Sequence, residues 1–161
     1  MTMGKEKTLM LLFLFILIIG VNNTKAQDTD SSGAKIFIRQ ALTSLQQKDY
    51  EKSREYALKA LEIDPDDGEA YILIGAAYVN SAEICSSDRF SKGMIFCLAV
   101  DMFEKAKEVD KSLTEKAEKL IKVYSKYFPS KEEIFIEPVE GQKYKIGCWI
   151  KRETTVRFSN Y

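Results

Sequence analysis

The sequence contains no histidine, and this absence excludes several kinds of catalytic and metal site. Hydrolases that activate a serine or cysteine through an imidazole need this residue, and so do metal sites with imidazole ligands. The eight glycines are scattered along the chain, so no glycine-rich phosphate-binding loop occurs. The sequence therefore favours a protein that is not an enzyme and that carries no catalytic residues, no metal ion and no cofactor.

An excess of charge of one sign is also missing. Lys and Arg total 24 residues, Asp and Glu total 24, and the formal net charge is zero. A protein that binds nucleic acid needs a basic surface that displaces counterions from phosphates, so nucleic acid is not an expected partner. Hydrophobic residues make up 45% of the chain and charged residues 30%, which is typical of a folded domain and excludes a disordered tail.

A long apolar run occurs near the N-terminus. Two lysines precede the unbroken apolar segment Leu9–Ile19, and small residues lead up to Ala26. This order is typical of a secretory signal peptide. The alternative is a transmembrane anchor, but the run has about half of the roughly 20 residues that a span needs. We therefore expect residues 1–26 to be a cleaved signal peptide, the only part of the chain that meets a membrane, and residues 27–33 to be a flexible leader.

The middle of the chain repeats itself with a period of 34 residues. Segments 34–44 and 68–78 share the spacing of their aromatic and small residues, whereas segments 55–65 and 101–111 are alike at an offset of 46 residues. A single insertion of 12 residues, somewhere in 80–98, explains both offsets. Apolar residues at helical spacing predict the following helices: Ala34–Gln47, Tyr50–Ile63, Gly68–Ala82, Lys92–Val109 and Ser112–Tyr127.

These helix-turn-helix units resemble the tetratricopeptide repeat family. The segment Tyr71–Tyr78 (YILIGAAY) is similar to the first helix of the family's repeat, and Ala60–Pro65 (ALEIDP) is similar to the end of its second helix. The resemblance covers residues 34–128. It implies an all-α superhelical solenoid of about 2.5 repeats that acts as a protein-protein interaction module.

The resemblance also implies a binding surface. In tetratricopeptide arrays the first helix of each pair lines a concave groove that holds peptides. The corresponding residues here are Ile38, Leu42, Leu45, Ile72, Ala76, Val79 and Lys122. Such a groove is apolar at its N-terminal end and charged near Lys122. The alternative is that the chain's own leader or tail covers this surface.

The C-terminal segment 129–161 loses the helical spacing. Residues alternate between apolar and polar over 142–150, and a second β-rich run follows at 154–159, so we expect a small β-hairpin. A two-stranded hairpin is marginally stable alone, and it must dock on the helices or on a partner. We expect Trp149 to pack on the last helix; the alternative is an exposed recognition residue.

The chain has three cysteines. Export would place them where disulfides persist. Cys85 and Cys97 flank a short loop of the insertion, and two antiparallel helices could bring them within bonding distance. The alternative is three buried thiols. We expect Cys148 to remain a buried free thiol.

Together these features predict a non-enzymatic scaffold or adaptor that binds a protein or peptide in its helical groove. The predicted signal peptide indicates export, and the C-terminal segment resembles the tail of a group of exported bacterial tetratricopeptide proteins. The resemblance implies that the protein lies in the periplasm of a Gram-negative bacterium, or is secreted or held at its cell surface. The alternative function is a small accessory or structural subunit of a larger envelope complex, docked through its C-terminal hairpin.

Overall fold

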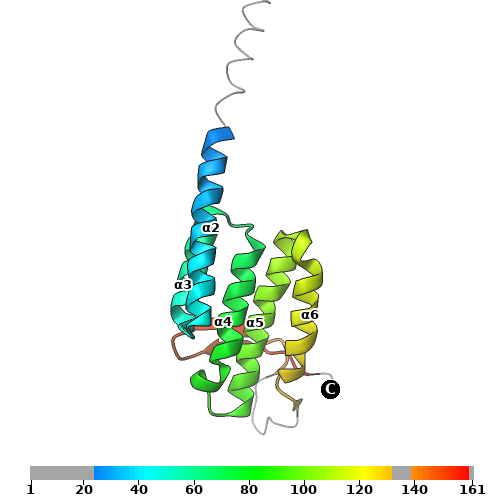
Figure 1. The fold of residues 1–161 in the computed structure, drawn as a ribbon. Helices are drawn as coiled ribbons and strands as arrows, with labels where there is room; N and C mark the ends of the chain where they lie inside the picture. Colours follow the sequence, from blue (N-terminus) through cyan, green and yellow to red (C-terminus); the bar gives the residue numbers. More distant parts are fainter. Residues whose placement is uncertain (1–23, 132–138, 160–161) are drawn as a thin grey trace, which may run out of the picture.

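The computed structural model describes residues 24–131 and 139–159, and its helices stand side by side in one antiparallel row (Figure 1). Each helix packs against the next one in the sequence, and α2 also contacts α4. The predicted helical repeat solenoid with a small C-terminal β-hairpin is confirmed. The helices of the described residues are α2 (Thr24–Gln46), α3 (Tyr50–Ile63), α4 (Gly68–Cys85), α5 (Arg89–Val109) and α6 (Thr114–Tyr124), with short 3-10 turns at Lys111–Leu113 and Ser125–Tyr127.

Aspartate side chains begin three of the helices. Asp49, Asp67 and Asp88 precede α3, α4 and α5, and each carboxylate accepts a hydrogen bond from the backbone N–H three residues further on. Such an N-cap satisfies one of the free N–H groups of the first turn and contributes about 1 kcal/mol. The sequence therefore specifies these helix starts locally, and the predicted bounds of α3 are confirmed.

The expectation of a flexible leader at residues 27–33 is wrong, because α2 begins at Thr24 and continues through them. Ala34 is only 2% exposed, so the helix is already packed at this point. Extending a helix from a packed turn adds one hydrogen bond for each residue fixed, which favours continuation toward the N-terminus. Most of the predicted signal peptide lies outside the described residues, and cleavage after Ala26 stays a prediction.

The predicted insertion lengthens two helices. α4 continues to Cys85, α5 begins at Arg89, and only residues 86–88 connect them. The fourth helix therefore begins three residues before the predicted Lys92 and ends at the predicted Val109. Its added turns carry buried apolar side chains, including Met94 and Ile95, and this burial explains why the segment is helical.

A close contact between small and aromatic residues joins three helices. Phe103 of α5 is fully buried, and its ring lies so near Gly75 of α4 that a Cβ at that glycine would overlap it. The same ring stacks on Tyr124 of α6, with the centroids 5.9 Å apart. The helices can approach this closely because Gly75 has no side chain.

The hairpin consists of β1 (Lys143–Ile146) and β2 (Arg152–Thr155), paired antiparallel. It crosses the row of helices near the lower ends of α4 and α5 in Figure 1 and packs on α5. The strands are shorter than predicted because residues 147–151 form a turn, in which the N–H of Lys151 donates to the carbonyl of Gly147. Two residues of this turn, Cys148 and Lys151, have positive φ angles of 58° and 46°, which end the strand.

Ser53→Ala is expected to stabilise the protein. Ser53 is fully buried between helices, and its hydroxyl has no hydrogen-bond partner in the described residues. Removing an unsatisfied buried hydroxyl should raise the free energy of unfolding by about 1 kcal/mol, measured by urea unfolding. Ser81→Ala is the matched control, because that buried hydroxyl donates to the carbonyl of Ala77 at 2.7 Å. A less stable Ser53→Ala variant would contradict the prediction.

Gly75→Ala is expected to destabilise the protein. The new methyl group would collide with the Phe103 ring, and overpacking of this kind costs about 1–3 kcal/mol. Gly33→Ala is the control, because there a Cβ would meet only the tip of the Ile63 side chain, so the better helix propensity of alanine should leave stability unchanged or raised. Thermal unfolding of both variants checks this, and equal melting temperatures would show that the helices can separate without cost.

Candidate protein-interaction surfaces

The predicted groove residues lie on α2, α4 and α6, the first helices of three successive units. α2 and α4 contact each other directly. Leu42 is 44% exposed, and Lys122 is exposed near the other end of the row. The apolar side chains between them are half-buried: Ile38, Leu45, Ala76 and Val79. The exposed apolar part of this surface is therefore centred on Leu42.

Ile72 does not belong to the surface. Its side chain is only 6% exposed and lies in the main core cluster with Ala41 and Ala70. The reason is that α2 packs beside α4, so a residue of α4 that faces α2 is enclosed. The prediction of Ile72 as a binding residue is therefore wrong.

The hairpin is attached away from the predicted groove residues. Its ring contacts, hydrogen bonds and disulfide within the described residues involve other side chains of α3, α4 and α5. The described part of the tail thus makes none of these contacts with the groove positions.

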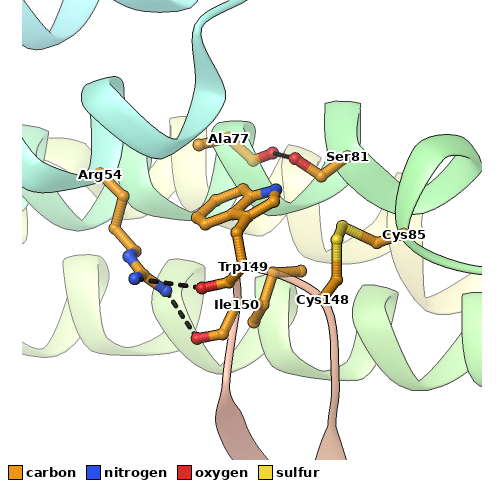
Figure 2. Close-up of a disulfide and its surroundings, with 7 residues drawn as sticks. All are labelled: Arg54, Ala77, Ser81, Cys85, Cys148, Trp149 and Ile150. Atoms are coloured by element: carbon orange, nitrogen blue, oxygen red, sulfur yellow. Dashed lines mark hydrogen bonds between the residues drawn. A yellow bond between two sulfur atoms is a disulfide. The ribbon is translucent and has the colours of Figure 1, made fainter.

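The predicted disulfide between Cys85 and Cys97 is wrong, and so is the expectation of a free Cys148. Cys85, the last residue of α4, is bonded to Cys148 in the hairpin turn (Figure 2), with the Cα atoms 5.4 Å apart. Cys97 is the free cysteine, and it is fully buried because α5 turns it toward the core. Burial raises the pKa of the Cys97 thiol to about 11, so this thiol stays protonated and unreactive at neutral pH.

Trp149 packs beside the disulfide, between α3 and α4. Its ring lies 5.9 Å from the ring of Tyr78, and the Arg54 guanidinium lies 4.7 Å from its centroid. Arg54 also donates to the carbonyl of Ile150 at 2.7 Å and to that of Trp149 at 3.4 Å (Figure 2). The expected packing on the last helix is wrong, because residues 147–151 leave the strand and carry the ring to α4.

A half-buried carboxylate on α5 holds the second strand. Asp101 accepts a hydrogen bond from the Thr154 hydroxyl and another from the Arg157 guanidinium, each at 2.6 Å. Arg157 also donates to the carbonyl of Cys97 at 2.6 Å and to Glu104 at 3.2 Å. Hydrogen bonds to charged groups contribute more than neutral ones, so this cluster fixes the position of β2 on the helix.

The row of helix-turn-helix units defines a helical repeat protein. Residues 34–67 match the family model of the tetratricopeptide repeat. This segment is therefore similar to a tetratricopeptide repeat, and repeats of this family generally mediate protein-protein interactions. The comparison with curated proteins gave no match, and neither did the comparison with solved structures. Within the described residues no helix is long and apolar enough to cross a membrane.

Sequence reasoning missed the contacts that anchor the tail. One signal was available in the sequence. Asp101 is a carboxylate within the most apolar part of α5, which indicates that it has a partner on another element, and Arg157 is a basic residue within a β-rich run. The pairing of Cys85 with Cys148 gave no such signal, because 63 residues separate them and the turn that presents Cys148 depends on tertiary packing.

Cys148→Ser is expected to destabilise the folded protein. The bond closes a loop of 63 residues, and the chain-entropy model assigns about 4 kcal/mol to a loop of this length. Urea unfolding can be followed through Trp149, the single tryptophan of the chain. Cys97→Ser is the control, because it removes a cysteine outside the bond. A reducing agent should lower the unfolding midpoint of this variant as it does that of the wild-type protein. Identical midpoints for the oxidised and reduced wild-type protein would contradict the prediction.

Proposed function

We propose that this helical repeat protein is a non-enzymatic adaptor of the cell envelope that binds a protein or peptide along the first helices of its repeats. The observation that carries the proposal is Leu42, a large apolar side chain that is 44% exposed on α2 beside half-buried apolar neighbours on α2 and α4. Exposed apolar patches mark interaction sites. Lys122 supplies a charged end to the same surface.

We also propose export to the periplasm or cell surface of a Gram-negative bacterium. Two independent features support this location. The N-terminal run Leu9–Ile19 has the composition of a signal peptide, and the Cys85–Cys148 bond, whose Cys148 end is exposed, needs a compartment in which disulfides persist. N-terminal sequencing of the protein from its native host should give Gln27 as the first residue, and an intact N-terminus would contradict it.

A second candidate function is an accessory subunit of a larger envelope complex that docks through the hairpin. The supporting observation is the anchoring of the hairpin by a disulfide, by Arg54 and by Asp101. A two-stranded hairpin is marginally stable alone, and here it is held rigidly on the helices while the outward residues Lys143 and Lys145 remain exposed.

Leu42→Asp is expected to weaken partner binding by about tenfold, equivalent to about 1.4 kcal/mol, without loss of helical circular dichroism. Ile84→Asp is the matched control, because Ile84 is 68% exposed on α4 but is not a groove residue. Cross-linking in the native host, from a photo-reactive amino acid placed at position 42 or at position 84, identifies the partner. The affinity of this partner for the Leu42→Asp and Ile84→Asp variants is then measured. Equal cross-linking from the two positions, or equal loss of binding in the two variants, would refute a specific groove.

A further inference from the structure

We propose that the open edge of β1 binds an extended acidic segment of a partner protein by adding it to the hairpin as a third strand. The proposal rests on the second candidate function above and names the chemistry of its partner. In the described residues β1 pairs with β2 on one side, and no other strand joins the sheet.

Among residues 24–131 and 139–159, no backbone partner is found for the hydrogen-bonding groups of β1 at this edge. Val156 donates to the carbonyl of Gln142 at 2.8 Å, and the register then pairs Tyr144 with Thr154 and Ile146 with Arg152. Directly opposed residues of an antiparallel ladder alternate between hydrogen-bonded and non-hydrogen-bonded pairs. The N–H and C=O groups of Lys143 and Lys145 therefore point away from β2, toward the open edge.

A hollow lies beside β1, on the side of the helices. β2 contacts Asp101, whereas the Tyr144 hydroxyl of β1 lies 3.0 Å from the hydroxyl of Ser91, nearer the start of α5. The open edge of β1 thus faces the turn between α4 and α5. The hollow, of about 270 Å³, separates the two, and its lining includes Ser86, Ser87, Asp88, Tyr144 and Gly147.

The side chains at the edge select the charge of the added segment. Lys143 and Lys145 are exposed on the solvent face of β1, and Lys145 forms no ion pair within the described residues. Opposed side chains of neighbouring strands lie about 4.5–5.5 Å apart at Cβ, and alternate residues share a face. Carboxylates at alternate positions of the added strand would therefore lie opposite Lys145 and Lys143, whose ammonium in the free protein donates to the Thr155 hydroxyl of β2 at 2.9 Å.

The residue between the two carboxylates should be uncharged. It points to the other face of the sheet, toward the hollow, whose lining includes the acidic residue Asp88. A second acidic side chain there would be repelled. The expected recognition pattern is thus acidic, neutral, acidic, in an extended conformation.

The test uses the oxidised full-length mature protein and short fluorescent peptides in which Glu and Thr alternate. A peptide of the same composition with its glutamates contiguous is the control ligand. Lys145→Pro removes the N–H that points away from β2 together with the Lys145 ammonium, and proline is tolerated at such edge positions. The double variant Lys143→Glu with Lys145→Glu reverses the charge without touching the core. Lys122→Glu makes a similar charge change on the helical groove.

We expect saturable binding of the alternating peptide, about tenfold weaker binding of the contiguous control, and a loss of about tenfold in both hairpin variants, with Lys122→Glu unchanged. The Lys145 amide should exchange its hydrogen faster than the Tyr144 amide in the free protein and slow down when the peptide binds. Absence of binding overturns the proposal and shows that the lysines only guard the edge against association. Equal loss in Lys122→Glu would also overturn it and would assign the acidic peptide to the groove.

Discussion

The attachment of the tail to the helices depends on the half-buried carboxylate of Asp101. A hairpin of two short strands cannot bury enough apolar surface to be stable alone, and its inward residues Ile146, Ile150 and Val156 gain from burial only when it lies on α5. The hydrogen bonds from Thr154 and Arg157 to Asp101 set that position. Once β2 is fixed there, the turn at residues 147–151 reaches α4, where Cys148 meets Cys85 and Trp149 meets Tyr78.

The C-terminal end of the helical row is closed by α6, which is the first helix of an incomplete repeat. α6 has no second helix of its own in the described residues, and its Ala117 is buried while Glu115 and Lys119 are exposed and paired with each other at 2.6 Å. A terminal repeat with a polar outer face is what a solenoid needs to avoid exposing an apolar stripe. The stack of Tyr124 on Phe103 holds α6 to the rest of the core.

The helical part could be predicted from the sequence because its signals are local. Asp49 and Asp67 mark helix starts, and the pair of Gly75 and Phe103 follows from the spacing of the repeat. The candidate site was predicted less well. Burial of Ile72 depends on how closely α2 approaches α4, and the disulfide partner of Cys85 depends on a turn with positive φ angles 63 residues away. Neither is encoded in a short stretch of sequence.

The distribution of charge adds a long-range component to the docking of the tail. Residues 139–161 contain five basic and two acidic side chains, whereas residues 27–138 contain 16 basic and 21 acidic ones. A positive tail is attracted to a negative helical array, and Arg157 with Asp101 and Glu104 makes this attraction at close range. The remaining lysines of β1 face outward, so the positive charge that is not used for docking is displayed at the open edge. Because the edge and the groove share no residues, changes at one should affect the other only through the packing of α4 and α5 between them.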